Sequence, residues 1–187
     1  MVGLIAPAVG LIAGALSERY SVGPSYTDFN QLTIEDDFIM ETRAFFLAQE
    51  YLIEEEGYRN GVYKDSRGIL TVGIGHKVLP GDNLKMGDVI SDARVQELFQ
   101  QDCSKAFEAA LSQAKQLDKY NEIMIARLTS VNFQLGTGWR TKFPNTWSML
   151  KNGDVQGAIN NLTKSAWYKQ TPSRVAAFVN TLQAQFA

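Results

Sequence analysis

The chain has 187 residues, of which 45% are apolar, with a net charge of −2 and a pI near 5.5. This length and apolar content are enough for one domain with a core of its own. The weak negative charge argues against a nucleic-acid partner, because proteins that bind nucleic acids usually carry a basic face. One cysteine, Cys103, excludes an intrachain disulfide, and together with one histidine it cannot build the usual thiolate-imidazole zinc site. We therefore expect no metal and no cofactor.

The first forty residues, 1–40, are predicted to be an extension of the main domain. Residues 2–16 carry no charge, and the polar segment 17–33 contains Gly23 and Pro24, which is typical of a connector. As a helix the uncharged run would be about 22 Å long, shorter than the roughly 30 Å hydrocarbon core of a membrane. We expect it to pack on the folded domain. Transient membrane contact during export and binding to a virion partner are the alternatives.

A helical pattern follows over about 36–56, and Gly57 is expected to end this helix. The apolar side chains of this segment are predicted to form one buried stripe that Glu56 extends: Phe45, Phe46, Leu52 and Ile53.

Next come two short runs, "GVYKD" at 61–65 and "GILTVGIGH" at 68–76, which are rich in β-branched and aromatic residues and separated by a turn sequence. They predict a small antiparallel sheet. Ser91 is a good N-cap for a long helix to about Gln113. One side of that helix is predicted to be buried: Val95, Leu98, Phe99, Cys103 and Ala106. The remaining chain is predicted to be helical over about 119–135, 144–152, 154–164 and 172–185.

These elements predict an α+β fold in a domain that covers residues 41–187. A small antiparallel-sheet lobe at about 57–90 is expected to be joined by the connecting helix, about 91–113, to an α-helical lobe at about 114–187. The extra N-terminal segment precedes this domain.

Two carboxyl groups are candidates for catalysis on chemical grounds. Glycosidic hydrolysis needs one carboxyl group that keeps its proton and a second that is ionised. Glu56 lies where an apolar helix face ends and suits the first role, whereas Asp65 lies on a polar turn and suits the second. The residues alone leave the alternatives open, because 54–56 can be a solvated acidic run and aspartate is common in turns.

The order Glu56, Asp65, Thr71 and then "VGIGH" resembles the active-site hairpin of the phage-type lysozymes, most closely those of the T-even phages. Further segments resemble the same family in the same order: "ELFQQD" ending at Asp102, "NFQLG" at 132–136, "SML" at 148–150, "NLTKS" at 161–165 and "WYKQTPSR" at 167–174. The resemblance covers about 45–182 and implies a lysozyme-like fold.

The same resemblance implies a lysozyme, an N-acetylmuramidase that hydrolyses the β-1,4 bond between N-acetylmuramic acid and N-acetylglucosamine with inversion and so lyses bacteria. Glu56 matches the general acid, Asp65 the carboxylate that activates water, and Thr71 a hydroxyl that helps to hold this water. Four positions match residues that contact sugar in the family: Phe133, Gln134, Thr146 and Asn161.

Other matching residues are expected to support the site. His76 would form a stabilising pair with Asp102, away from the bond that is cut. Arg174 would lie behind the general acid, where its fixed cation can orient the glutamate. The glutamates at 54–55 are expected to be dispensable. Arg67 departs from the family pattern, because the T-even enzyme has an acid at this turn position.

Two other functions remain open from the sequence. A lytic transglycosylase would cut the same bond with one glutamate and an internal hydroxyl, and would need neither Asp65 nor Thr71. A non-catalytic wall-binding virion component is the second. We expect a phage-encoded monomer whose partner is peptidoglycan and which acts on the bacterial cell wall from the periplasm. It could be an endolysin that ends infection or a virion enzyme that opens the wall at its start.

Overall fold

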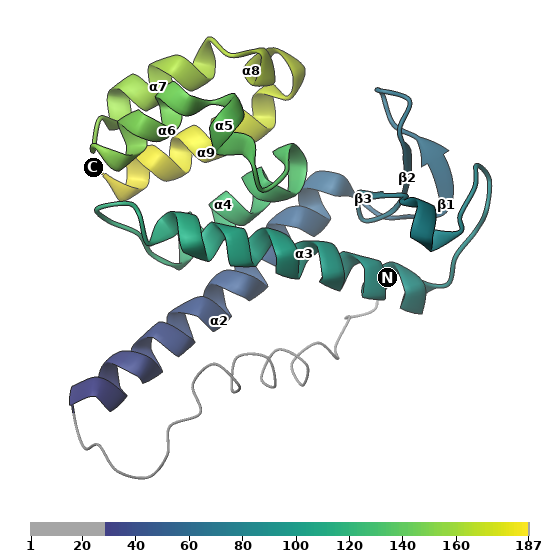
Figure 1. The fold of residues 1–187 in the computed structure, drawn as a ribbon, viewed down its shortest axis with the longest axis horizontal. Helices are drawn as coiled ribbons and strands as arrows, with labels where there is room; N and C mark the ends of the chain where they lie inside the picture. Colours follow the sequence, from purple (N-terminus) through teal and green to yellow (C-terminus); the bar gives the residue numbers. More distant parts are fainter. Residues whose placement is uncertain (1–28, 187) are drawn as a thin grey trace. The chain divides into compact units, whose positions relative to one another are not determined.

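The computed structural model describes residues 29–186 (Figure 1). The chain divides into two compact units, Met1–Thr42 and Arg43–Ala187, and the second holds every residue of the candidate site. The predicted connector at Gly23 and Pro24 and the expected packing of residues 2–16 lie outside the described residues. Within the described part of the chain, no helix combines the length and apolarity that crossing a membrane requires.

Along the described chain one helix precedes a single small sheet, and a series of helices follows it. The elements are α2 (Phe29–Glu56), β1 (Arg59–Lys64), β2 (Leu70–Gly73), β3 (His76–Lys77), η1 (Pro80–Asp82), α3 (Asp92–Ala114), α4 (Glu122–Leu135), α5 (Trp139–Lys142), α6 (Pro144–Lys151), α7 (Val155–Thr163), α8 (Ala166–Gln170) and α9 (Pro172–Gln185). This order confirms the predicted α+β class.

Helix α2 differs from its prediction at its start and on its face. It begins at Phe29, so residues 29–33 are helical rather than part of a connector. Phe45 and Leu52 are buried, but Phe46 is 37% exposed and Ile53 is 40% exposed, so the single predicted stripe is wrong. The reason is geometric, because adjacent residues of a helix point about 100° apart.

The predicted hairpin is present. Strand β1 pairs with β2 and β2 pairs with β3, all antiparallel, with Tyr63 opposite Thr71 and Val72 opposite His76. Apolar residues on one face of the sheet, including Val62 and Val72, form a small core with Leu98 of α3. The sheet is therefore fixed to the long helix that follows it.

Helix α3 begins as predicted, since the Ser91 hydroxyl accepts a hydrogen bond from the Arg94 N–H at 3.2 Å. All five side chains that were predicted on its inner face are buried. One of them is Cys103, and burial raises the pKa of its thiol to about 12, which makes it an unreactive core residue. Figure 1 shows the sheet beside the N-terminal part of α3, and α4 packs along the same helix.

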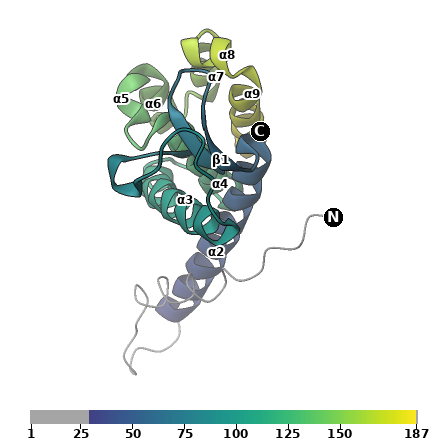
Figure 2. The same cartoon turned by 90° about the vertical axis from the view of Figure 1, so that its right-hand side faces the viewer.

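An aromatic cluster forms the core of the helical lobe. Figure 2 shows the helices of this lobe from a second side. The Trp139 ring lies at the centre, 5.7 Å from Trp147 and 6.3 Å from Phe178. The Trp167 ring also contacts Phe178, with their ring centres 6.3 Å apart. Trp139 and Trp167 belong to the short helices α5 and α8, which periodicity did not predict because each has five residues or fewer.

Candidate active site

Glu56 is the last residue of α2, and its carboxyl group lies between α9 and the sheet. Helix α2 stops there because Gly57 adopts a left-handed conformation with φ 72°. Oε1 of Glu56 accepts a hydrogen bond from Nη2 of the buried Arg174 on α9. Oε2 faces the turn between β2 and β3, where a Cβ atom added to Gly75 would lie only 2.9 Å away. The side chain is 23% exposed, so the carboxyl group is partly withdrawn from water.

Asp65 lies on the turn between β1 and β2 and is held by the backbone of that turn. Its Oδ1 accepts the N–H groups of Arg67 and Ile69, each at 2.8 Å. Its Oδ2 is 3.4 Å from Nε of the Arg67 side chain. The hydrogen bond from Ile69 is the largest influence, and together with the contacts from Arg67 it outweighs desolvation and lowers the pKa of Asp65. The site thus contains a fixed, ionised carboxylate.

Thr71 joins Asp65 through Ile69. The Ile69 carbonyl accepts the Asp65 N–H at 2.9 Å and the Thr71 hydroxyl at 3.2 Å. Because the Thr71 hydroxyl donates its hydrogen to this carbonyl, the lone pairs of its oxygen remain available to accept a hydrogen bond from water. The hairpin therefore presents an anion from its turn and a hydroxyl acceptor from β2.

Two of the predicted sugar-binding residues make internal contacts with their polar atoms. Oε1 of Gln134 accepts the Trp167 indole N–H at 2.8 Å, and Nε2 of Gln134 lies 3.2 Å from the Thr171 hydroxyl. Thr146 is fully buried and donates to Oδ1 of Asn161 at 2.8 Å. These contacts fix the amide of Asn161 and the end of α4.

Phe133 and Asn161 keep part of their surface accessible. Phe133 is half-buried, with its ring centre 6.3 Å from that of Phe99. The Asn161 side chain accepts the Thr146 hydroxyl through its oxygen, so its NH₂ group is the polar part left for a ligand.

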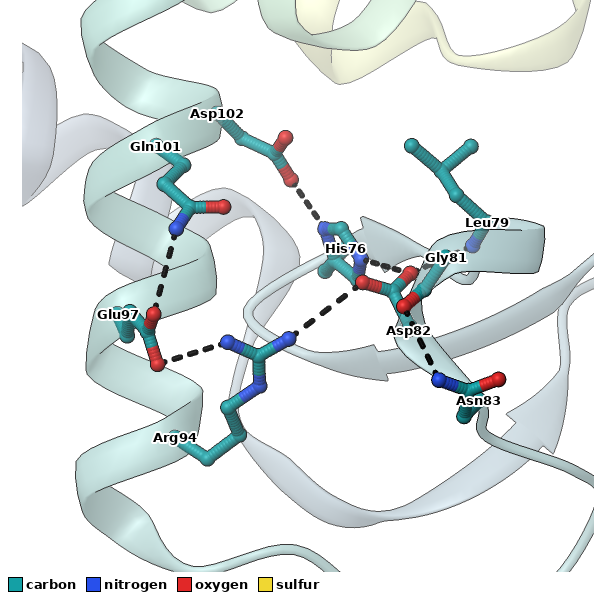
Figure 3. Close-up of polar contacts among 9 residues, drawn as sticks. All are labelled: His76, Leu79, Gly81, Asp82, Asn83, Arg94, Glu97, Gln101 and Asp102. Carbon is teal, nitrogen blue, oxygen red and sulfur yellow. Dashed lines mark hydrogen bonds and ion pairs between the residues drawn. The ribbon is translucent and has the colours of Figure 1, made fainter.

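His76 lies on β3 between two carboxylates, as Figure 3 shows. Its Nδ1 is 2.6 Å from Oδ2 of Asp102 on α3, so the expected pair is present. Its Nε2 is 3.0 Å from Oδ2 of Asp82, a second partner that the sequence did not indicate. Arg94 extends the cluster, with Nη2 3.6 Å from Asp82 and Nη1 2.7 Å from Glu97.

Electrostatics in this cluster favour the imidazolium form. Burial is the largest single influence on His76 and lowers its pKa, but the hydrogen bonds and charges of Asp102 and Asp82 together outweigh it, so the pKa of His76 is raised. Burial would raise the pKa of Asp82, but His76 and the Leu79 N–H outweigh this effect and lower it. The cluster links β3, η1 and α3.

Sequence reasoning missed Glu55, which was expected to be dispensable. Its Oε1 is 2.5 Å from Nη1 of Arg127, and its Oε2 accepts the Ser130 hydroxyl at 2.6 Å and Nη1 of Arg174. Arg174 therefore bridges the neighbouring carboxylates of Glu55 and Glu56. Only the unfavourable position of three acids at a helix C-terminus hinted that one more of them was engaged.

A helix-end glutamate bound by arginine, an ionised aspartate on a hairpin and a nearby hydroxyl, all in an α+β fold, define a candidate glycoside hydrolase of the two-carboxylate class. The model of the phage lysozyme family matches residues 53–184, and the chain belongs to this family. This membership confirms the resemblance that the motifs indicated and the expected kind of enzyme, a lysozyme.

Individual relatives agree with the family. The chain is 30% identical over 135 residues to the peptidoglycan hydrolase gp36 of Pseudomonas phage phiKMV. The aligned region covers 72% of this chain but only 15% of that relative. The chain is 28% identical over 148 residues to probable T4-type lysozyme 2 of Dictyostelium discoideum, covering 67% of this chain and 87% of that protein. It is 27% identical over 148 residues to the pre-baseplate central spike protein Gp5 of Enterobacteria phage T4, covering 68% of this chain and 26% of Gp5.

Proposed function

We propose that this chain is a phage-encoded peptidoglycan hydrolase that cleaves the β-1,4 bond between N-acetylmuramic acid and N-acetylglucosamine in the bacterial cell wall. The observation that carries the proposal is the contrast between two carboxyl groups in a chain of the phage lysozyme family. Glu56 is partly buried at a helix end, and Asp65 is an anion fixed by backbone N–H groups. Hydrolysis of a glycosidic bond requires such a difference.

In the proposed mechanism Glu56 is the general acid. Arg174 holds its Oε1, so Oε2, which faces the sheet turn, delivers the proton to the leaving glycosidic oxygen. Asp65 accepts a proton from the attacking water through Oδ2, because its Oδ1 is occupied by two backbone N–H groups. The oxygen of Thr71 accepts the second proton of this water in a hydrogen bond and so orients it. Attack from the face opposite the leaving group inverts the anomeric centre.

We also propose that the sugar chain binds along α4 and α7. The ring of Phe133 would pack on a sugar face, and the NH₂ group of Asn161 would donate to a sugar oxygen. Thr146 would act mainly by holding Asn161, and Gln134 by fixing the end of α4, where Phe133 lies. The polar atoms of Gln134 and Thr146 are already bonded inside the protein.

Two other functions predict different products. A lytic transglycosylase would use one glutamate and attack by a hydroxyl group of the sugar itself. Asp65 and Thr71 would then have no role in the reaction. A wall-binding virion component would release no fragments. We favour hydrolysis because Asp65 and Thr71 both occur at the positions where they match the hairpin of the family, together with Glu56.

The setting of the reaction is also a proposal. We propose a monomer that reaches the wall from the periplasm. Either role, endolysin or virion enzyme, is compatible with this site, and export could involve transient membrane contact of residues 2–16. Localising the protein in purified virions or in the envelope of infected cells would separate these roles.

The test of the proposed function uses the full chain and purified peptidoglycan. Hydrolysis predicts a falling turbidity with new reducing ends at N-acetylmuramic acid. Products that end in 1,6-anhydro sugars would establish the transglycosylase instead. Binding to the wall with no soluble fragments at any enzyme concentration would establish the non-catalytic role.

A further inference from the structure

Glu55 binds three side chains through its two oxygens, although it is not one of the two carboxylates proposed to act on the sugar. Three donors from two helices reach its oxygens: Arg127 and Ser130 from α4 and Arg174 from α9. Arg127 and Ser130 are three residues apart and so lie on one face of α4. The Arg127 guanidinium is also placed over the Tyr51 ring, at 4.1 Å from its centre. Glu55 is thus held in one position by its surroundings.

This position decides what Arg174 can do. A guanidinium group often grips one carboxylate with two parallel N–H bonds. Here Nη1 binds Glu55 and Nη2 binds Glu56, so the general acid receives only one of the two bonds. Because Arg174 is nearly fully buried, Glu55 also supplies a counter-charge that does not depend on the ionisation of Glu56.

The charged groups around Glu56 come from three helices. Arg174 contacts it from α9, Glu55 precedes it on α2, and Arg127 of α4 acts through Glu55. On the sheet side its other oxygen faces Gly75, which carries no charge. An opposite charge within hydrogen-bond distance favours the ionised form of a carboxyl group, and a second bond from the same cation strengthens that effect. A general acid must instead keep its proton until the bond breaks.

We infer that Glu55 is a positioning residue for the hydrolysis. It binds Nη1 of Arg174, so that the guanidinium group orients Glu56 through Nη2 alone and does not form a two-bond ion pair with it. This inference rests on the proposed function. It assigns to the first of two neighbouring glutamates the task of limiting the contact between Arg174 and the second.

The test is the pH dependence of kcat/KM on peptidoglycan fragments for Glu55→Gln. Removing the charge lets Arg174 turn both nitrogens to Glu56, so the alkaline limb should move to lower pH by about one unit. At a pH above the limb, hydrolysis should then fall about tenfold. Glu55→Asp keeps the charge and should move the limb less. Glu54→Gln is the matched control, because it removes the same charge from an exposed neighbour on the same turn and should leave the limb in place.

Glu55→Gln leaves two buried arginines with less counter-charge, so a second variant guards against misfolding. The double variant Glu55→Gln with Arg127→Gln keeps the net charge and still frees Arg174, and it should show the same displaced limb. If the folded variants keep the limb of Glu54→Gln, the positioning role is refuted, whatever happens to the overall rate. Glu56→Gln tests the proposed function separately, since an active Glu56→Gln would refute the general acid and not merely its positioning.

Discussion

The two carboxylates of the site are anchored in opposite ways. Asp65 is held by N–H groups two and four residues further along the chain, within one exposed turn. Glu56 is held by Arg174, which is 118 residues away in the sequence and buried in the helical lobe. The anion is thus fixed by local backbone, whereas the acid depends on tertiary packing. Changes in the helical lobe should therefore alter the acid and leave the anion intact.

The largest expected effect comes from removing either carboxylate. Glu56→Gln and Asp65→Asn should each lower wall hydrolysis by about 10² to 10⁴, because general acid and general base steps contribute about this much. Both variants keep the side-chain volume, so cooperative melting should persist. Turbidity clearing by purified variants is the measurement.

The matched control for this pair is Glu54→Gln, which should be nearly silent. If a folded Asp65→Asn protein kept full activity, Asp65 would lose its role as the base, and the same holds for Glu56 as the acid.

Gly75→Ala should give the next largest effect, because the added methyl group would contact the Glu56 carboxyl group from the sheet side. The added Cβ would meet the Glu56 carboxyl group at 2.9 Å, and Gly75 has φ 70°, which L-residues rarely adopt. We expect a clear loss of hydrolysis and a destabilisation of about 1 to 3 kcal/mol. Kinetics and thermal melting of the same preparation would report both.

Gly138→Ala serves as its control, since Gly138 has φ −90° and no atom within 4 Å of an added Cβ. Equal losses in the two alanine variants would mean that contact with Glu56 is not the cause.

Much of the fold was predictable because its signals are local. Ser91 and the periodic apolar residues after it predicted α3, and "DSRG" between two β-rich runs predicted the hairpin. The outward position of Phe46 was not predicted, because periodicity alone does not say how wide a buried face is.

The site was predictable in part, and the difference follows sequence distance. Glu56, Asp65 and Thr71 lie within one short motif, and the family resemblance indicated Arg174. The partners of Glu55 lie 72, 75 and 119 residues away from it, and no spacing rule connects them. Asp82 was missed for a different reason, since aspartate in a Pro-Gly-Asp turn has an ordinary explanation.

The His76 cluster should affect stability rather than turnover. The pKa of His76 is raised, so its contribution is full below its unfolded pKa of 6.5 and is lost as pH rises through the folded value. The pKa of Asp82 is lowered, so its contribution holds above its unfolded pKa of 3.8 and is lost as pH falls through the folded value. Both contributions are present between these two values, and the stabilisation should be greatest there.

His76→Asn should therefore lower the free energy of unfolding by about 1.5 to 3 kcal/mol near pH 5.5, the range for hydrogen bonds to charged groups. Above the folded pKa of His76 the loss should be smaller. Denaturant unfolding at both pH values measures it. A strong drop in turnover with unchanged stability would instead place His76 in the reaction.

The smallest effect should come from Arg67→Gln. The Arg67 side chain is 69% exposed and 3.4 Å from Asp65, and backbone N–H groups hold the anion without it. The acid limb of the pH profile should move to higher pH by less than about half a unit. A shift as large as the one expected for Glu55→Gln would contradict the contrast between a backbone-anchored base and an arginine-anchored acid.

The central claim, that Glu56 and Asp65 act as acid and base on opposite faces of the sugar, is tested most directly by the anomeric configuration of the first product. NMR spectra collected in the first moments of hydrolysis, before mutarotation, report this configuration. Inversion of the β-1,4 bond predicts the α-anomer at the new reducing end. The β-anomer would instead show that the configuration is retained, and Asp65 could not then be the base that activates an inverting water.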